Sequence, residues 1–336
     1  MRLRTLFFLT VLVGIGAAVW MRSALAPVNI NAQVRELVQI PKGFSTAQIA
    51  DLLEERGVIR SSLAFRLYAR WKGLESNIQA GSFVLQPSLS AVDLLAALTT
   101  GAATEVTVTI PEGYTVADID ALLAEKKLIQ PGEFITCART CELDEFGFLP
   151  ERDTRAERGG RVEGYVFPDT YFVMKEGFTA EEFLRRTLGN FRTRVVDVLG
   201  SAVAASGRGF GDIVTMASLI EEEAANDAER AMIAGILWKR LDGGMSLGVD
   251  AAVRYALGKQ RGVITASDLD IDSPYNLRRF KGLPPGPIAN PGLKSIRASV
   301  QPEQSPYWYY LHGKDGMIRY AETNDEHNVN RAKFLP

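Results

Sequence analysis

Four prolines fall within the eleven residues of Gly282-Leu-Pro-Pro-Gly-Pro-Ile-Ala-Asn-Pro-Gly292, out of 15 in the whole chain of 336. Because proline fixes its own φ angle and has no amide hydrogen to donate, such a segment can form neither a helix nor a central strand. The string is therefore predicted to be a stiff, extended loop. A rigid loop with exposed carbonyl groups suits the wall of a site for an extended polymer, and a plain structural connector is the alternative.

The N-terminus carries a second constraint. Residues 1–4 read Met-Arg-Leu-Arg, the 17 residues 5–21 carry no charge, and Arg22 follows. As a helix this stretch spans about 25 Å, the short end of what crosses a bilayer. A cleaved signal peptide is the alternative, because Ala24-Leu-Ala26 supplies a small-x-small site, but Pro27 would fit an extended protease site poorly. We therefore predict a cytoplasmic end at 1–4, a transmembrane anchor at 5–22 and an exported remainder.

Past this segment the chain repeats itself. Residues 40–49 read I-P-K-G-F-S-T-A-Q-I and residues 110–119 read I-P-E-G-Y-T-V-A-D-I, and nine of the 20 positions aligned from 40 and 110 are identical. Each copy predicts a short strand, a Pro-x-Gly turn and a helix, with Ser45 or Thr115 as the N-cap.

The segment between the copies predicts further elements. Helices are expected over 61–71 and 91–100, and a strand over 79–85. Residues 30–130 are therefore expected to form one membrane-proximal α+β unit. The strand, turn and helix of each copy look like the opening of LysM-type modules, which bind chitin-like glycans. A duplicated unit that only positions the next domain is the alternative.

Charge and cysteine content exclude several functions. The 38 basic and 40 acidic side chains give a formal net charge of -2, so there is no basic excess for a nucleic-acid backbone. Two Cys and two His are too few for a cysteine-rich zinc site or a disulfide scaffold. Cys137 and Cys141 are spaced C-x3-C, and in an oxidising compartment they could form a small disulfide loop. Two free thiols are the alternative.

Three consecutive glutamates end a helical pattern over residues 212–224. At about 100° per residue, the apolar side chains of this segment lie on one narrow face. Glu222 lies opposite that face and is predicted to be solvated, whereas Glu221 and Glu223 flank it on either side. A carboxyl group at such an edge can be partly desolvated, which favours the protonated form that a general acid needs. A hydrated helix end is the plainer interpretation, and the helical geometry alone does not choose between Glu221 and Glu223.

Several short strings then follow in a fixed order. They are E-G-Y-V-F-P-D-T-Y at 163–171, A-S-L-I-E-E-E at 217–223, S-P-Y-N at 273–276, the proline string, and E-H-N at 326–328. Together with the I-P-x-G repeats they resemble the membrane-anchored endolytic murein transglycosylases, the MltG/YceG-like family, over most of the exported chain. The resemblance implies one inner-membrane helix, a LysM-like subdomain and a catalytic domain that cleaves nascent peptidoglycan strands.

The resemblance also implies roles for individual residues. The family's catalytic glutamate is the first Glu of A-S-[LI]-I-E-x-E, which corresponds to Glu221. The family often has L-Q-x-D after the catalytic helix, whereas this chain has Leu247-Gly-Val-Asp250, with Gly248 in place of the amide. The candidate substrate-binding residues are Glu223, Asp250, Tyr165, Asp169, Tyr275, Asn276, Asn290, Glu326, His327 and Asn328.

The expected fold class is α+β. It comprises the transmembrane helix, a LysM-like α+β subdomain at 30–130, a connecting segment at 131–160 and an α+β catalytic domain at 161–336.

The implied activity is that of an endolytic lytic transglycosylase. It would cleave the MurNAc–GlcNAc bond of nascent strands, leave 1,6-anhydromuramyl ends and help to terminate glycan elongation, without a metal or other cofactor. The expected partners are peptidoglycan glycan strands, peptidoglycan synthases (penicillin-binding proteins) and the membrane, with no nucleic acid. The expected location is the cytoplasmic (inner) membrane, with the catalytic domain in the periplasm.

Two other functions remain open. One is a non-enzymatic, membrane-anchored scaffold that binds peptidoglycan and recruits cell-wall synthases. The other is a hydrolase that uses Glu221 with a second carboxylate such as Asp250 or Glu223.

Overall fold

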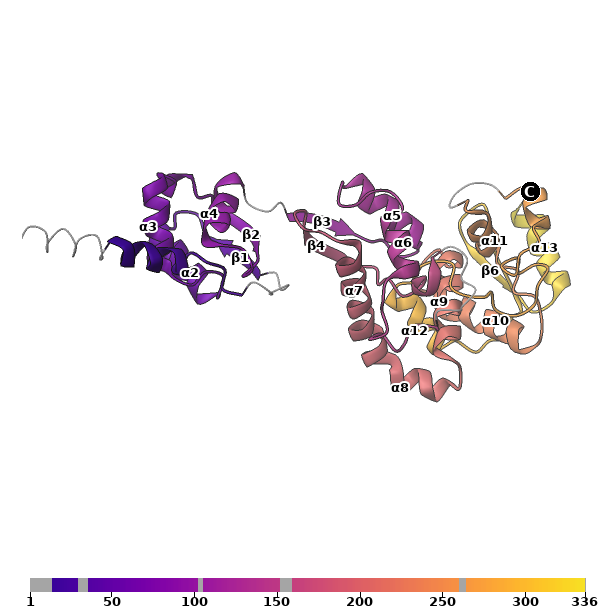
Figure 1. Ribbon diagram of the computed structural model, residues 1–336. Coiled ribbons are helices and arrows are strands. Elements are labelled where there is room, and N and C mark those ends of the chain that lie inside the picture. Colours follow the sequence, from indigo (N-terminus) through magenta and orange to yellow (C-terminus); the bar gives the residue numbers. More distant parts are fainter. Residues whose placement is uncertain (1–13, 30–35, 102–104, 152–158, 260–263, 336) are drawn as a thin grey trace, which may run out of the picture. The chain divides into compact units, whose positions relative to one another are not determined.

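The computed structural model describes residues 14–29, 36–101, 105–151, 159–259 and 264–335 (Figure 1). The chain divides into two compact units. Unit 1 comprises residues 1–106 with 172–177, and unit 2 comprises residues 107–171 and 178–336. Helices predominate, and the strands of the described residues form three two-stranded sheets. The expected mixture of helix and sheet, α+β, is confirmed.

Unit 1 contains the first repeat copy and the elements that follow it. Its sheet pairs β1 with β2 in antiparallel register, with Val38 opposite Phe83. The helices and strand predicted between the two copies are present close to their predicted bounds. The elements of unit 1 are β1 (Glu36–Ile40), α2 (Thr46–Glu55), α3 (Ser62–Lys72), η1 (Glu75–Asn77), β2 (Gly81–Leu85) and α4 (Ala91–Thr100).

One hydrophobic core fills unit 1. Leu25 belongs to this core, and its carbonyl oxygen accepts a hydrogen bond from the Ala91 amide at 3.0 Å. The chain is helical over residues 14–24, directly before Leu25. Within the described ranges, no helix is both long and apolar enough to cross a membrane. The first half of the predicted anchor at 5–22, residues 5–13, lies outside those ranges. Other members of the core are Val38, Ile40, Leu53, Phe65, Phe83, Leu85 and Leu95.

The two repeat turns have the same local structure. Gly43 and Gly113 have φ angles of 85° and 82°, in the left-handed region that favours glycine. In each copy the amide after the glycine donates to the carbonyl of the turn's proline at 3.4 Å. Ser45 and Thr115 each form a capping box with the third residue of the helix that follows. The strand–turn–helix prediction and both N-caps are confirmed.

The second copy belongs to unit 2 and not to unit 1. The chain passes from one unit to the other within β3 (Glu105–Thr109), which pairs with β4 (Thr170–Met174). The boundary at Val106–Thr107 therefore differs from the one expected near residue 130. The physical reason is that α5 (Val116–Glu125) packs against α6 (Glu133–Thr140), a helix inside the segment expected to be a connector.

A buried carboxylate joins α5 to α6. Asp120 is 5% exposed and accepts the amide hydrogens of Gly132 at 2.7 Å and Phe134 at 2.9 Å. It thereby caps α6, whose N-cap residue, Gly132, has no side chain to do so. Near the other end of α6, Cys137 and Cys141 form a disulfide, the first of the two alternatives considered for this pair.

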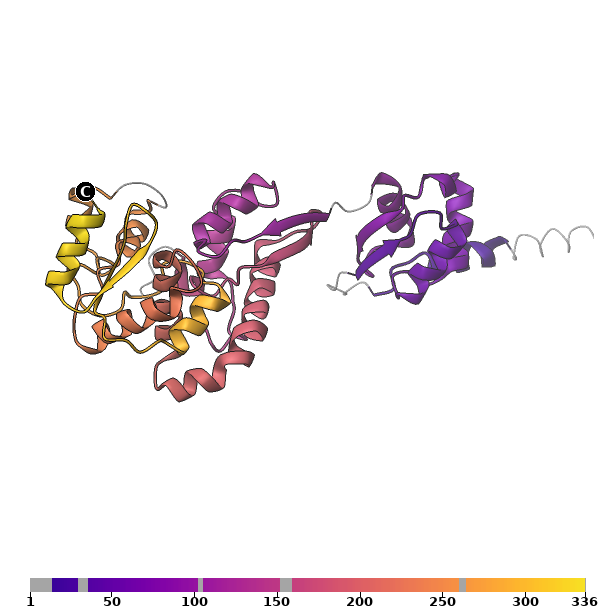
Figure 2. The ribbon, with the colours of Figure 1, turned by 180° about the vertical axis from the view of Figure 1, so that it is seen from behind.

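Helices build most of unit 2 (Figure 2). α9 is its central element, and every residue from Ile213 to Ile220 is buried. It packs against α10, α11 and α12. Near the C-terminus, β5 and β6 form an antiparallel hairpin that α13 packs against. The remaining elements of unit 2 are η2 (Gly160–Val162), α7 (Ala180–Phe191), the π-helical η3 (Arg192–Val196), α8 (Asp197–Ser206), α9 (Phe210–Glu223), α10 (Arg230–Asp242), α11 (Asp250–Leu257), η4 (Ser267–Asp270), α12 (Leu293–Val300), β5 (Tyr309–His312), β6 (Ile318–Ala321) and α13 (Asn324–Phe334).

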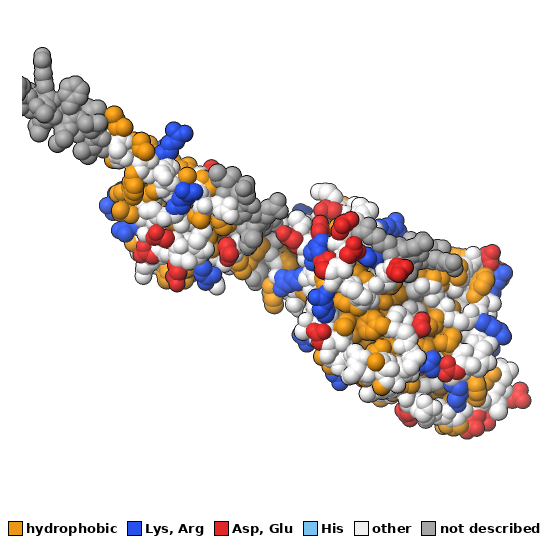
Figure 3. All heavy atoms as spheres, turned by 60° about the horizontal axis from the view of Figure 1, so that its bottom comes forward, with side chains coloured by type: hydrophobic (Ala, Val, Ile, Leu, Met, Phe, Trp, Pro, Cys, Tyr) orange, Lys and Arg blue, Asp and Glu red, His pale blue; other side chains and the backbone are white. Residues whose placement is uncertain are grey.

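Basic and acidic side chains are interspersed over the face drawn in Figure 3. This distribution agrees with the near-zero net charge of the sequence.

Replacing the carboxylate that caps α6 should weaken unit 2. Asp120→Ala removes the acceptor of the buried Phe134 amide and of the partly buried Gly132 and Ile135 amides, and we expect the free energy of unfolding to fall by about 3 kcal/mol. Urea unfolding followed by the fluorescence of Trp238, which is 3% exposed, measures the loss. Asp51→Ala removes an exposed aspartate from α2 and should change the value by less than about 0.5 kcal/mol. Equal effects of the two substitutions would contradict the capping role.

Candidate active site

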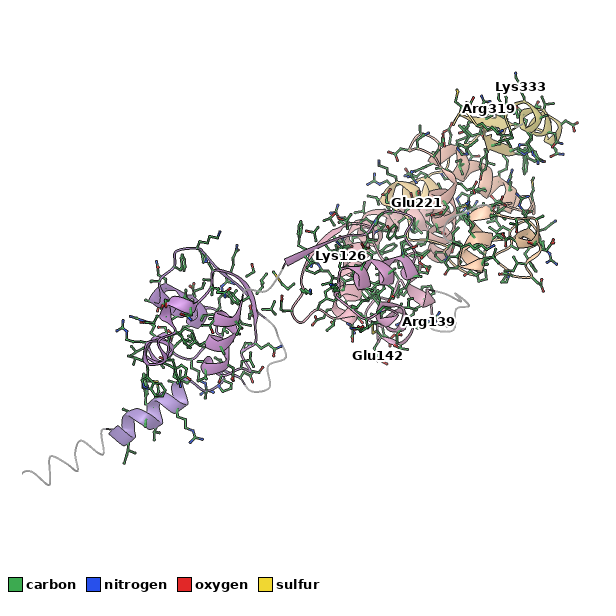
Figure 4. The ribbon with its side chains drawn as sticks, turned by 90° about the horizontal axis from the view of Figure 1, so that it is seen from above. Lys126, Arg139, Glu142, Glu221, Arg319 and Lys333 are labelled. Carbon is green, nitrogen blue, oxygen red and sulfur yellow. A yellow bond between two sulfur atoms is a disulfide. The ribbon has the colours of Figure 1, made fainter. Side chains whose placement is uncertain are left out.

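The three glutamates at the end of α9 lie in different environments. The side chain of Glu221 is 7% exposed, Glu223 is partly buried, and Glu222 is exposed. The prediction that Glu221 and Glu223 flank the buried face, with Glu222 opposite, is confirmed. Figure 4 shows Glu221 within the middle of unit 2, apart from Arg319 and Lys333 near the C-terminal end.

Both carboxylate oxygens of Glu221 have a hydrogen-bond partner. Oε1 accepts from Nη1 of Arg230 at 2.9 Å, and Oε2 accepts from the Gly292 amide at 2.9 Å. Arg230 is 9% exposed and also donates to the Ser295 hydroxyl and, at 3.3 Å, to Asp227. Burial lowers the pKa of Arg230, but the surrounding carboxylates, Glu221 foremost, raise it above its usual value. The carboxyl group of Glu221 is therefore fixed in one orientation.

The proline string forms the wall beside Glu221. The Ile288 amide donates to the Ser218 hydroxyl at 3.0 Å, one helical turn before Glu221 on α9. With the Gly292 amide bound to Glu221, the string is attached to α9 at two points. The proline string, predicted to be a stiff loop suited to the wall of a site, therefore lies directly beside Glu221.

Asn290 connects this wall to two other segments. Its side chain is fully buried, accepts the Val166 amide at 2.9 Å and donates to the carbonyl of Tyr114 at 2.8 Å. Its main chain exchanges hydrogen bonds with the second repeat turn, since Gly113 donates to Asn290 and Asn290 donates to Tyr114, each at 2.9 Å. One residue of the wall therefore holds both the Pro111–Gly113 turn and the E-G-Y string.

A second carboxyl group is buried behind the wall. Glu163 is 1% exposed and accepts hydrogen bonds from the Val116 amide at 3.0 Å, Asn290 at 3.2 Å and the Tyr255 hydroxyl at 3.2 Å. Burial raises the pKa of Glu163 to about 8, and the bonds from Val116 and Tyr255 offset part of that rise. Glu163 is thus protonated at neutral pH and acts as a neutral hydrogen-bonding bridge.

Two hollows lie at Glu222, the residue after Glu221, and both are lined by Gly113, Asp118 and Glu222. A Cβ atom on Gly113 would lie 2.9 Å from Oε1 of Glu222 and 3.9 Å from Cγ of Glu221, so the turn packs directly on both glutamates. Although Glu222 is exposed as a residue, partial desolvation of its carboxyl group beside the turn, and then the charge of Glu221, raise the pKa of Glu222 to about 7. The first hollow is also lined by Thr115, Ala117, Glu163, Ala251, Arg254, Tyr255, Gly258, Lys259 and Ile288.

Several predicted substrate-binding side chains are part of the interior. Tyr165, Tyr275 and Asn276 are each no more than 1% exposed, as is Asn290. The Asn276 amide donates to the carbonyls of Leu269 and Ile271 and so folds its own loop. Tyr165 packs within a cluster of phenylalanines. These four residues build the framework of the site and present almost no surface to a ligand.

Other predicted residues are engaged elsewhere in unit 2. Asp250 pairs with Arg278, with N–O distances of 2.5 and 2.8 Å. Asp169 accepts from the Asn190 amide at 2.9 Å, and Glu223 accepts from the Tyr310 hydroxyl at 2.8 Å. Burial raises the pKa of Glu223, and the bond from Tyr310 offsets part of that rise.

The E-H-N string lies on α13. Glu326 accepts the Glu322 amide at the start of that helix, at 2.9 Å, and Asn328 is exposed. The His327 ring stacks on Tyr309 with ring centroids 5.2 Å apart, and burial lowers the pKa of His327. Within the described part of the chain, none of these three side chains has a hydrogen bond to Glu221.

The departure from the family pattern at Gly248 has a local explanation. Gly248 has a φ angle of 67°, in the left-handed region that a glutamine rarely adopts, and its amide donates to the Leu277 carbonyl at 3.0 Å.

Sequence reasoning did not select two residues of the site, Arg230 and Glu112. Oε2 of Glu112 lies 4.0 Å from Nη2 of Arg230. Arg230 is one of 38 basic residues and has no distinguishing pattern. Glu112 did have a distinguishing pattern, because the two repeat copies carry opposite charges at this turn position. The first copy has Lys42 and the second has Glu112. Among the residues that the structure describes, no cluster of three or more His, Cys, Asp or Glu is placed to hold a metal ion.

Comparison with known proteins places this arrangement in a family. The family described as YceG-like matches residues 38–333. The chain belongs to the YceG-like family. The endolytic murein transglycosylase of Bacillus subtilis (strain 168) is 32% identical over 334 residues, which cover 95% of this chain and 90% of that relative.

Two further YceG-like relatives extend the comparison. The endolytic murein transglycosylase of Streptococcus pneumoniae (strain ATCC BAA-255 / R6) is also 32% identical, and this chain spans 60% of its length. The crystal structure of the yceG-like protein lmo1499 from Listeria monocytogenes superposes with a TM-score of 0.63 at 29% identity, covering 88% of this chain and 99% of that one. The fold described above is therefore shared with a solved member of the family.

The buried Glu163 should make stability fall as pH rises. The folded state keeps a proton on Glu163 up to about pH 8, whereas the unfolded chain loses it near the ordinary glutamate value of 4.5. Between these values the folded state binds more protons, so the free energy of unfolding falls by at most about 1.4 kcal/mol per pH unit. Glu163→Gln keeps a neutral group of the same size and should flatten this dependence, giving a variant more stable than the wild type at pH 8. Urea unfolding between pH 5 and 8 measures the free energy of unfolding of the wild type and of the variant. The same pH dependence in both proteins would contradict a buried, protonated Glu163.

Proposed function

We propose that this YceG-like chain is an endolytic lytic transglycosylase that acts on peptidoglycan. The observation that carries the proposal is the environment of Glu221, a nearly buried carboxyl group held by Arg230 and the Gly292 amide, whose neighbour in the chain, Glu222, lines a hollowed surface. The relatives named endolytic murein transglycosylase, at 32% identity over more than nine-tenths of this chain, support the same activity.

Glu221 is the proposed acid and base of the reaction. In its protonated form it donates its proton to the oxygen that links N-acetylmuramic acid to N-acetylglucosamine, and the bond from C1 to that oxygen breaks. The resulting carboxylate takes the proton of the same sugar's C6 hydroxyl, whose oxygen forms the new bond to C1. The product is a 1,6-anhydro end, and no water is consumed. A nucleophile within the same sugar gains from proximity, so one carboxyl group suffices.

The surroundings of Glu221 favour this mechanism over hydrolysis with Asp250 or Glu223. Hydrolysing glycosidases use two carboxyl groups that flank the scissile bond. Asp250 is paired with Arg278, and Glu223 points to Tyr310 from the other edge of α9. Both side chains already have partners away from Glu221.

We further propose that the protein is held in the cytoplasmic membrane by residues 5–22, with both units in the periplasm. The integration of Leu25 into the core of unit 1 supports an uncleaved N-terminus, because cleavage after Ala26 would remove a core residue. Unit 1, which carries the first repeat turn, is the proposed LysM-like module, and peptidoglycan synthases are the proposed protein partners.

Glu221→Gln tests the catalytic role. Glutamine keeps the size and the hydrogen-bonding reach but has no titratable proton. We expect a folded protein whose rate of glycan cleavage is lower than that of the wild type by at least about 10⁴-fold. General acid–base catalysis contributes about 10²–10⁴-fold, and here one group serves both steps. Mass spectrometry of digested glycan strands measures cleavage.

The product type separates the candidate functions in the same experiment. Anhydro ends indicate a transglycosylase, reducing ends a hydrolase, and intact strands a binding scaffold. Glu55→Gln, the same substitution at an exposed site in unit 1, is the control and should keep wild-type activity. More than about a tenth of wild-type activity in Glu221→Gln, a loss below 1.4 kcal/mol, would exclude Glu221 as the acid.

The anchor has a separate test. N-terminal sequencing of the mature protein from the membrane fraction should find the chain intact through Ala26. A mature chain that begins at Pro27 would contradict the anchor and indicate a cleaved signal peptide.

A further inference from the structure

The first of the two hollows at Glu222 has a volume of about 130 Å³, and the mechanism above gives it no role. Three of its lining residues, Glu163, Tyr255 and Ile288, are only 1%, 7% and 3% exposed. The Ile288 amide is bound to α9, and Glu163 is bound to Asn290. The hollow is therefore built on the same framework that positions Glu221.

Charged side chains of both signs line this hollow. Asp118 on α5 and Glu222 on α9 supply carboxyl groups, whereas Arg254 on α11 and Lys259, just after α11, supply cations. The charges act on one another, because Arg254 opposes the rise in the pKa of Glu222 that burial and Glu221 cause, and Asp118 adds to that rise. A ligand group that carries both a negative and a positive charge would find a partner for each of them here.

Arg254 is the lining cation that is available to a ligand. Lys259 is paired with Asp268, with Nζ 2.6 Å from Oδ1. Arg254 is half-buried, and within the described ranges its guanidinium makes no hydrogen bond and no ion pair. The planar fork of donors on a guanidinium matches the two oxygens of a carboxylate. The hollow therefore favours a carboxylate at Arg254.

The position of the hollow relative to the proposed reaction indicates which carboxylate this is. Glu222 directly follows Glu221, the proposed acid at C1 of N-acetylmuramic acid. In peptidoglycan the lactyl group on C3 of that same sugar carries the peptide stem, so the stem begins within one sugar ring of the cleaved bond. A stem that is not cross-linked bears carboxylates and a free ammonium group, and cross-linking converts the ammonium group into a neutral amide. The two signs of charge in the hollow match the uncross-linked form.

We propose that the first hollow is a subsite for the uncross-linked peptide stem of the muramic acid at the cleaved bond. Arg254 binds a stem carboxylate, and Glu222 and Asp118 face the stem ammonium group. This inference rests on the proposed function, because the reaction at Glu221 is what places the muramic acid. It gives the enzyme a means of distinguishing nascent strands from cross-linked wall.

The experiment compares three forms of the same glycan strands, cleaved by the wild-type full chain in detergent micelles. The first form carries free stems, the second has the stem amines N-acetylated, and the third has the stems removed by an amidase. We expect kcat/KM to be about tenfold lower on the second form and lower still on the third, because each loses charged hydrogen bonds. Equal kcat/KM on all three forms would overturn the subsite.

Substitutions assign the contacts to individual side chains. Arg254→Gln should lower kcat/KM about tenfold on strands with stems and leave the value on stem-free strands unchanged. Glu222→Gln should remove the preference for free over acetylated amines. Arg297→Gln, the same substitution at an exposed position of α12, is the control and should change none of the values. An Arg254→Gln protein that loses the same factor on all three forms would show a structural role and overturn the assignment.

A binding measurement does not depend on cleavage. In the Glu221→Gln background, fluorescence anisotropy of labelled strands should show about tenfold tighter binding of strands with stems than of stem-free strands, and adding Arg254→Gln should remove the difference. Equal affinities before that addition would overturn the subsite. A wild type that leaves reducing ends or intact strands would instead overturn the proposed function, and the anisotropy would still decide whether the hollow binds stems.

Discussion

The hydrogen bonds of Asn290 hold the site together. A single buried side chain satisfies a main-chain amide at Val166 and a main-chain carbonyl at Tyr114, and it also donates to Glu163. These partners are 124 to 176 residues away along the chain. Because an unpaired buried polar group costs about 1–3 kcal/mol, the hydrogen bonds of Asn290 stabilise the arrangement in which these segments meet. The position of the proline string beside α9 depends on this junction.

Because the proline string is stiff, the hydrogen bonds of Asn290 also fix the position of the Glu221 carboxyl group. Asn290 and Gly292 are two residues apart in a segment whose prolines restrict its backbone. Fixing Asn290 therefore also fixes the Gly292 amide, which binds one oxygen of Glu221. Arg230 binds the other oxygen, so the two hydrogen bonds together fix the orientation of the Glu221 carboxyl group. A site of this kind is organised before any ligand enters it.

Local features of the fold could be predicted from the sequence. The two capping boxes, the left-handed turn glycines, the helix with three terminal glutamates and the rigid loop all follow from short patterns. The unit boundary could not be predicted, because it depends on long-range packing of α5 against α6 and on the buried cap from Asp120. Burial also depends on such packing, so the strings did not reveal that four of the predicted substrate-binding residues lie inside the fold. These residues are Tyr165, Tyr275, Asn276 and Asn290.

The separation of the two repeat copies has an evolutionary consequence. A side chain added at Gly43 would meet open space, whereas one added at Gly113 would press against Glu222. At the first turn only the positive φ angle limits which residue can replace the glycine. Asparagine, which also adopts the left-handed region, could replace it during divergence. At the second turn the contact with Glu222 also limits which residue can replace the glycine. A substitution at the first turn therefore meets only the limit set by its backbone, whereas one at the second turn also meets the side chains of the site.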